Sequence, residues 1–293
     1  MPSPKPPATP AYRFNAIGTP WRIDTPEPLT PELQRGIADR IDQFDATYSR
    51  FREDSLVSRI GRAPGSWRFP NDAAPLFDLY KKLYTSTAGM VSPLVGERME
   101  NLGYDRAYSL RAASVPVRVP AWDDAFSWDG ECLTTARPVL LDVGAAGKGY
   151  LVDIVAGMLR DAGVDSYLVD ASGDLLHRGS EPVRIALEHP GDAGKAIGIY
   201  SLHNGALCAS ASNRRAWGAG LHHIIDAITG EPTSQVVASW AMTDTALEAD
   251  GLATALFFAG AGTFAPDFTF HYVRMFSNGS LEYSRELPGE IFQ

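Results

Sequence analysis

Leu141–Asp153 reads LDVGAAGKGYLVD, a short apolar run followed by a glycine-rich turn, one lysine and the start of a helical pattern. We expect Pro138–Asp142 to form a strand, a helix to begin near Lys148, and Ser166–Asp170 to form the next strand. These elements form a strand-helix-strand unit, with the glycine-rich turn between its first strand and its helix.

The glycines of this turn favour binding of an anion. Gly144, Gly147 and Gly149 allow close approach of the backbone, and the new helix presents unpaired N–H groups beside Lys148. The spacing and Tyr150 exclude the Gly-x-x-x-x-Gly-Lys-Ser/Thr loop, and the order of glycines excludes Gly-x-Gly-x-x-Gly. Neither a nucleoside triphosphatase nor a nicotinamide-dependent dehydrogenase fits. The alternative is an ordinary strand-to-helix turn in which the glycines serve packing.

Composition is that of an ordinary globular protein. The chain has 293 residues, of which 45% are hydrophobic and 21% charged, enough to bury a large core. A formal net charge of −9 argues against a nucleic-acid partner, because sequence-independent binding of phosphates needs a basic face. Cys132 and Cys208 lack the spacing of a disulfide framework or a metal site, so we interpret them as buried thiols.

The N-terminus carries no recognisable targeting segment. Its first ten residues, MPSPKPPATP, lack the apolar core of a secretory signal, and no stretch of eighteen apolar residues occurs in the chain. We therefore expect a cytoplasmic protein without a membrane span, or an exported one if a leader precedes this sequence. Residues 1–12 are expected to be disordered and residues 13–293 to form one domain.

Helix and strand patterns alternate along the chain without a long linker or an internal repeat, which indicates one compact α+β domain. Ala16–Asp24 is expected to be a strand, Pro31–Tyr48 a helix, and Leu76–Thr87 a second helix ended by Gly89. Gly103–Thr135 is rich in turn-forming residues, and the sequence assigns it no role.

A later helix carries a candidate metal site. Thr245 and Glu248 have capping-box spacing, so a helix is expected to begin there. Asp250 and Thr254 are four residues apart and lie on one helix face among apolar neighbours. A carboxylate and a hydroxyl suit Mg²⁺. The alternative is local bonding, in which Asp250 caps and Thr254 bonds back to a carbonyl.

A third candidate lies in His222–Pro232, where a β-branched run delivers a histidine and an aspartate into a turn. Adjacent strand residues point to opposite sides, so only one of His222 and His223 faces a given site. Histidine serves as a general base near neutral pH. We expect His223 and Asp226 to act together; a structural histidine beside an apolar strand is the alternative.

Taken together, these segments resemble those of ApbE-type FAD:protein FMN transferases, and they occur in the same order. The matching segments are Ala16–Thr19, Tyr48–Ser55, Leu141–Asp153, Val169–Asp174, His223–Gly230 and Ala246–Thr254. The resemblance covers the chain from about Ala16 to Gly260. It implies a single compact ApbE-like (T-fold-like) α+β domain with mixed sheets flanked by helices.

The resemblance also implies an activity, which is the Mg²⁺-dependent transfer of FMN from FAD, the substrate, to a Thr/Ser hydroxyl in the flavinylation motif of an acceptor protein, with AMP leaving. Lys148 and its turn would hold the pyrophosphate, and the Ala145 carbonyl, Asp250 and Thr254 would hold Mg²⁺. His223 would accept the proton, steadied by Asp226. The residues that would line the FAD pocket are Ile17, Phe51, Met90, Val91, Ser92, Asp142 and Ile224, with the Phe51 ring available to a flat base.

The chain departs from the family pattern at several positions. Val91-Ser92-Pro93 stands where Phe-Asp-Pro is common, so a carboxylate is missing, and Ala227 replaces a proline. Arg214 and Arg215 are either phosphate contacts or a solvated pair of charges. Two further activities stay open: hydrolysis of FAD to FMN and AMP at the same site, and FAD binding without catalysis, which the missing carboxylate suggests.

Overall fold

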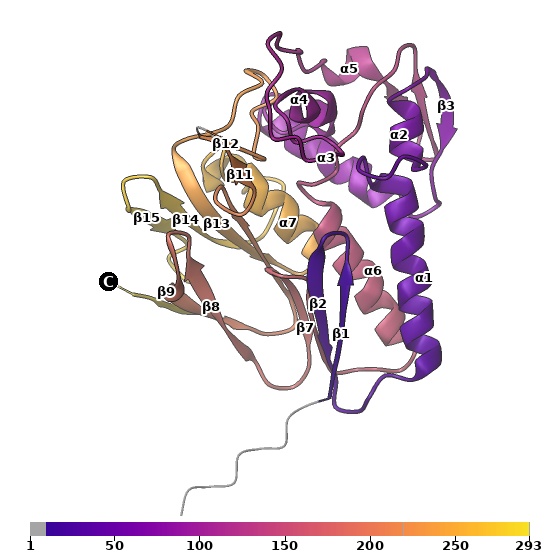
Figure 1. Cartoon of the computed structure of the whole chain (residues 1–293). Helices are drawn as coiled ribbons and strands as arrows, with labels where there is room; N and C mark the ends of the chain where they lie inside the picture. The colour runs from indigo at the N-terminus through magenta and orange to yellow at the C-terminus, as the bar shows by residue number, and fades with distance from the viewer. Residues whose placement is uncertain (1–9, 219, 293) are drawn as a thin grey trace, which may run out of the picture.

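An antiparallel sheet of eight strands forms the centre of the computed structural model, which describes residues 10–218 and 220–292 (Figure 1). The strand order is β1-β2-β6-β7-β10-β13-β14-β15. The strands are β1 Ala11–Ala16, β2 Thr19–Asp24, β6 Tyr167–Asp170, β7 Asp174–Arg178, β10 Ala206–Ala211, β13 Val236–Thr243, β14 His271–Phe276 and β15 Leu281–Tyr283.

Three small sheets accompany the large one. They are β16-β9-β8 (Gly289–Ile291, Asp192–Leu202, Val183–His189), β3-β5-β4 (Gly65–Arg68, Cys132–Thr135, Ser127–Trp128) and β11-β12 (Ala216–Trp217, Leu221–His222). Every pair of strands with a register in the described part of the chain is antiparallel. The α+β class is therefore confirmed, but the sheets are antiparallel where mixed sheets were expected.

The helices are α1 Pro31–Tyr48, α2 Leu56–Ile60, α3 Ala74–Ser86, α4 Gly96–Asn101, α5 Trp122–Ala125, α6 Gly147–Asp161 and α7 Ala246–Ala255, with 3₁₀ turns at Pro93–Val95 and Ala261–Thr263. Of these, α6 and α7 cover one face of the large sheet. α7 packs on β10 and β13, α6 packs beside it, and α1 and α3 lie outside them (Figure 1). The main core fills the space between helices and sheet, and a second core lies between the sheet and β8–β9. No helix within the described ranges is long and apolar enough to cross a membrane.

Several elements follow the sequence closely. α1 has the expected bounds because Thr30 caps it, accepting a hydrogen bond from the Leu33 N–H, while Pro31 occupies the first turn. α3 begins two residues earlier than predicted, and Gly89 follows it with a φ of +93°. α6 begins at Gly147, one residue before Lys148.

The N-terminal strand differs from the prediction. Ala16–Asp24 is not one strand, because Ile17 and Gly18 adopt positive φ angles and turn the chain from β1 into β2. Ala11 and Tyr12 belong to β1, so they are not part of a disordered segment. Residues 1–9 of that segment lie outside the described residues.

The expected strand Pro138–Asp142 is also wrong. Its N–H groups donate to carbonyls outside any strand, Val139 to Ile60 at the end of α2 and Asp142 to Pro93 in a 3₁₀ turn, and Pro138 has no N–H to offer a ladder. An extended segment outside the sheets therefore leads into α6. β6 follows the helix as predicted but pairs antiparallel with β2 and β7, so no parallel strand-helix-strand unit forms.

The two cysteines are free. Cys208 is fully buried in β10, as expected, whereas Cys132 in β5 is only partly buried.

Candidate active site

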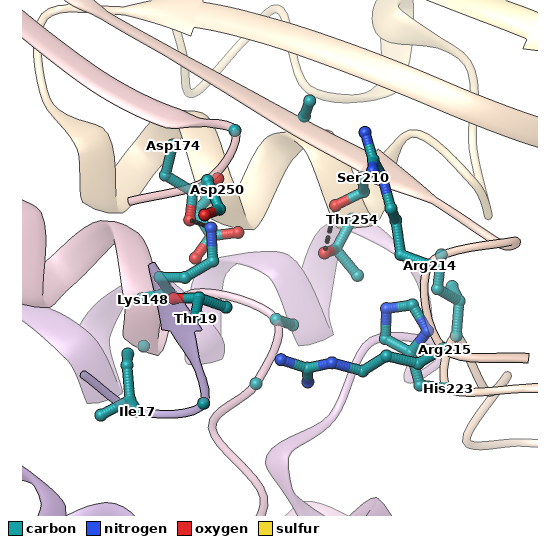
Figure 2. Close-up of a pocket in the computed structure, with 18 of the residues that line it drawn as sticks. Ile17, Thr19, Lys148, Asp174, Ser210, Arg214, Arg215, His223, Asp250 and Thr254 are labelled. Atoms are coloured by element: carbon teal, nitrogen blue, oxygen red, sulfur yellow. Dashed lines mark hydrogen bonds and ion pairs between the residues drawn. The ribbon is translucent and has the colours of Figure 1, made fainter. Parts of the chain in front are cut away.

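A cavity of about 1320 Å³ opens where the β1–β2 turn, the segment before α6, β7, β10 and α7 meet (Figure 2). Eleven of the thirteen residues predicted for the site line it, namely Ile17, Phe51, Val91, Ser92, Asp142, Ala145, Lys148, His223, Ile224, Asp250 and Thr254. Met90 and Asp226 are not among the lining residues.

Hydrogen bonds at its N-terminus fix the position of α7, the helix that carries Asp250. Thr245 caps the helix by accepting a hydrogen bond from the Glu248 N–H, as the capping-box pattern predicts. The reciprocal half of the box is absent, because the Thr245 N–H donates to Thr243 Oγ1 instead. At the same end, the Asp153 carboxylate of α6 accepts from the N–H groups of Ala246 and Leu247. The middle of α6 is thereby joined to the N-terminus of α7.

Two buried carboxylates share one ammonium group at the cavity wall. Lys148 Nζ lies 2.5 Å from Asp174 Oδ2 and donates to the Ala171 carbonyl at 2.9 Å. Burial raises the pKa of Asp250 well above its ordinary value, the Asp174 charge adds to the rise, and Lys148 opposes it. Burial lowers the pKa of Lys148, but Asp174 and Asp250 outweigh it, so the net shift is upward. When both carboxylates are ionised they exceed Lys148 by one negative charge, an excess that adds to the effect of burial on the pKa of Asp250.

This excess negative charge and the oxygen atoms around it fit Mg²⁺. Asp250 is 5% exposed, Thr254 lies one turn along the same helix face, and Ala145 lines the same cavity. Ser210 of β10 holds the Thr254 hydroxyl at 3.2 Å (Figure 2). Within residues 10–218 and 220–292, no three His, Cys, Asp or Glu side chains gather as a metal site. A magnesium ion here would therefore need carbonyl and hydroxyl oxygens as well.

The glycine-rich turn is held from both sides. The Ala145 N–H donates to the Tyr80 hydroxyl, which is fully buried in α3. The Gly144 N–H donates to Asp142 Oδ1 at 2.7 Å, and Asp142 Oδ2 accepts from Arg50 Nε at 2.5 Å. Burial would raise the pKa of Asp142, but the Arg50 charge and hydrogen bond outweigh it and the pKa is lowered. Asp142 therefore serves as an ionised support of the turn.

The Phe51 ring, which was expected to offer a face to a flat base, already contacts two other side chains. The Arg50 guanidinium lies 4.1 Å from its centroid, and the Tyr108 ring stacks on it at 5.3 Å with an interplanar angle of 8°. Tyr108 is 55% exposed and has a φ of +49°. Tyr108 and Phe51 both line the cavity, so the partly exposed Tyr108 ring is a second surface on which a flat ligand ring can stack.

His223, not His222, faces the cavity. His222 turns to the other side, where its Nε2 lies 2.7 Å from the Thr233 carbonyl. Burial lowers the pKa of His223 to about 3, and the nearby charge of Arg215 lowers it further. Its Nδ1 is buried and has no hydrogen-bond partner in the described structure. A neutral imidazole with an unused nitrogen is therefore present at neutral pH.

The structure does not bring Asp226 onto His223. Asp226 Oδ1 accepts from the N–H groups of Ile228 and Thr229, which makes it a turn residue, and no hydrogen bond joins it to His223 among the described atoms. Met90 likewise contributes its carbonyl, which accepts from the Ala227 N–H. Ser92 lines the cavity while its hydroxyl accepts from the Leu94 N–H.

Four functional candidates were not assigned from the sequence: Arg50, Tyr108, Asp174 and Arg215. Asp174 ends the Val169–Asp174 segment that matches the family, and this match is the signal that could have identified it. Arg215 had been left open between a phosphate contact and a solvated charge. Arg50 lies in the Tyr48–Ser55 segment that matches the family, whereas Tyr108 reaches Phe51 from a part of the sequence that no pattern marks.

Comparisons with known proteins agree with one another. The model of the ApbE family matches residues 17–265. The FAD:protein FMN transferase of Klebsiella pneumoniae is 26% identical over 283 residues, covering 87% of this chain and 81% of that protein, and the one of Salmonella typhimurium is 26% identical over 281 residues, covering 87% and 79%.

Solved structures show the same fold. The ApbE protein of Thermotoga maritima superposes with a TM-score of 0.82 at 23% identity, covering 95% of this chain and 97% of that one. Flavin transferase ApbE from Vibrio cholerae superposes with a TM-score of 0.78 at 22% identity, covering 95% and 97%.

Proposed function

The chain belongs to the ApbE family, and we propose that it moves FMN from FAD onto a serine or threonine hydroxyl of an acceptor protein with the aid of Mg²⁺. Transfer of FMN from FAD to an acceptor protein is the activity that its curated relatives carry in their names, and this chain is an enzyme of that class. The magnesium ion, the acceptor hydroxyl and the residue roles below are our proposal.

The observation that carries the proposal is the juxtaposition of a buried acidic cluster with a neutral imidazole across one cavity. Asp174 and Asp250 outnumber Lys148 on one wall, and His223 lies on another (Figure 2). Transfer to an alcohol needs both features, because diphosphate charge has to be neutralised and the hydroxyl has to lose its proton.

Asp250, Thr254 and the Ala145 carbonyl are the oxygen donors that would hold Mg²⁺. When bound, the ion would neutralise charge on the diphosphate. Hydrogen bonds hold these donors in position: the Gly149 N–H bonds to the Asp250 carboxylate, and the Ser210 hydroxyl bonds to the Thr254 hydroxyl. Tyr80 anchors the backbone at Ala145.

Lys148 is less available to bind phosphate than an unpaired lysine would be. Because Asp174 holds its ammonium, the charge available to a diphosphate is partly compensated. Lys148 would then act mainly by holding the acidic cluster at a fixed distance from the turn before α6. Its side chain still lines the cavity.

His223 would accept the proton of the acceptor hydroxyl. The oxygen forms a bond to the phosphorus of the FMN half, the bond from that phosphorus to the AMP oxygen breaks, and AMP leaves with the electron pair. The imidazole is neutral at pH 7 and can therefore accept a proton; because its low pKa makes it a weak base, it would take the proton as the hydroxyl oxygen bonds to phosphorus.

Chromatography of the nucleotides released from FAD tests this proposal. The protein is incubated with FAD and Mg²⁺, with and without a purified acceptor domain that carries a Thr/Ser flavinylation motif. The proposal expects AMP to appear only with acceptor and metal present, without free FMN. AMP with an equal amount of free FMN in both reactions would indicate hydrolysis, and unchanged FAD would indicate a binding protein.

A further inference from the structure

Most cations that line the cavity are already paired with carboxylates. Arg50 is held by Asp142, and Lys148 by Asp174. Arg214 bonds to Glu188 at 2.8 Å, with more than half of its side chain exposed. These pairs leave little charge free for an anionic substrate.

Arg215 is different from its neighbour. It is half-buried, it lines the cavity, and no carboxylate within residues 10–218 and 220–292 lies within ion-pair distance of it. Arg184 also lines the cavity without a partner, but it is exposed. In Figure 2 the Arg215 side chain extends into the cavity beside the His223 ring, whereas Arg214 runs in another direction.

The charge of Arg215 affects the pKa values of other residues that line the cavity. Burial is the largest cause of the low pKa of His223, and the charge of Arg215 is the next. Against the effect of burial, the same charge also lowers the pKa of Asp142, although less than Arg50 does. Arg215, His223 and Asp142 line one cavity, so the guanidinium lies among the groups that surround a bound substrate.

We propose that Arg215 binds the phosphate of the FMN half of FAD, the phosphate that receives the acceptor hydroxyl. This assignment rests on the proposed function and adds a group that contacts the reacting phosphate. The phosphorus under attack has to lie next to the oxygen that His223 deprotonates, so a cation beside His223 faces that phosphate and not the one that leaves with AMP. A guanidinium provides two parallel N–H donors for non-bridging phosphate oxygens, which carry the charge during transfer.

Binding of three ligands to Arg215→Gln tests the assignment, with Arg214→Gln as the matched control. The ligands are FMN, AMP and riboflavin, each titrated in Mg²⁺ by calorimetry. We expect Arg215→Gln to weaken FMN binding on the order of 10- to 100-fold, the worth of a charge-assisted hydrogen bond, while AMP and riboflavin affinities stay within about 3-fold. Arg214→Gln should leave all three unchanged, and Arg215→Lys should recover part of the FMN affinity.

The outcomes separate this assignment from the proposed function. If the wild-type protein forms no acceptor adduct but Arg215→Gln weakens FMN alone, the phosphate contact stands and the transfer proposal falls. If the wild-type protein forms the adduct but Arg215→Gln binds FMN as Arg214→Gln does, the assignment is overturned. Weakening of AMP in place of FMN, or of riboflavin to the same degree, would also overturn it.

Discussion

The backbone N–H of Gly149 donates a 2.8 Å hydrogen bond to Oδ2 of Asp250, across 101 positions of sequence. The first turn of α6 thus orients the carboxylate that α7 presents to the cavity. The contact is close because a glycine stands there: a Cβ would overlap the Ala246 carbonyl oxygen and lie 2.6 Å from Asp250 Cβ. The glycine-rich turn serves the packing of two helices as well as the ligand.

Gly149→Ala should therefore destabilise the protein and impair the site. We expect a loss of about 1–3 kcal/mol in the free energy of unfolding from overpacking, together with reduced FMN transfer. Gly157→Ala, in the same helix, is the control, since its Cβ would find only Arg160 Nη2 at 3.8 Å. That control should be neutral or stabilising by up to ~1 kcal/mol. Urea unfolding of both variants makes the comparison, and equal effects would contradict the packing argument.

The buried pair of Arg50 and Asp142 gives a second prediction. Asp142→Ala leaves a guanidinium that is 2% exposed without its carboxylate, and should cost about 3–5 kcal/mol of unfolding free energy. The double variant Arg50→Met/Asp142→Leu removes both charges and should be more stable than the single variant. A double variant that is less stable would show that the ion pair is not what the single change disrupts.

His223→Ala should slow transfer far more than it weakens FAD binding. Loss of a general base lowers kcat by roughly 10²- to 10⁴-fold, whereas FAD affinity should change only a few-fold. His222→Ala is the matched control, because its ring contacts the Thr233 carbonyl away from the cavity; it should affect stability more than kcat. Single-turnover kinetics measures the change in transfer rate, and a separate FAD titration measures the change in affinity. Parallel losses in rate and affinity would make His223 a structural residue.

The pH dependence of stability should report Asp153. Burial raises its pKa to about 6 even though it accepts two backbone hydrogen bonds from α7. A folded-state pKa above the unfolded value of ~3.9 means that its stabilising contribution is present below pH 4 and is lost as pH rises through 6. Relative to Asp153→Asn, the wild-type protein should therefore gain about 2 kcal/mol between pH 7 and pH 4. A stability difference that does not change with pH would contradict the shifted pKa.

Local patterns predicted those elements whose ends are fixed by nearby residues. Thr30 and Pro31 set the start of α1, and the four-residue spacing of Asp250 and Thr254 placed both on the cavity side of α7. The alternation of side chains along an extended segment predicted that only one of His222 and His223 faces the site.

Features that depend on contacts between residues far apart in sequence could not be predicted from local patterns. The pairing of Lys148 with Asp174 brings together an α6 residue and the start of β7, and it changes the lysine from a free cation into a compensated one. The stacking of Tyr108 on Phe51 joins two loops. Pro138–Asp142 has the apolar character of a strand, but its hydrogen-bonding partners are the end of α2 and a 3₁₀ turn, and only the fold determines that.

Intact-mass spectrometry of the acceptor domain tests the central claim most directly. Wild-type protein, FAD, Mg²⁺ and acceptor should give an acceptor heavier by one FMN, with one AMP released for each adduct. Chelation of the metal or the Asp250→Ala substitution should abolish the mass gain while the protein remains folded. An acceptor of unchanged mass beside consumed FAD would contradict transfer, and an undiminished adduct with Asp250→Ala would contradict the site that we assign to it.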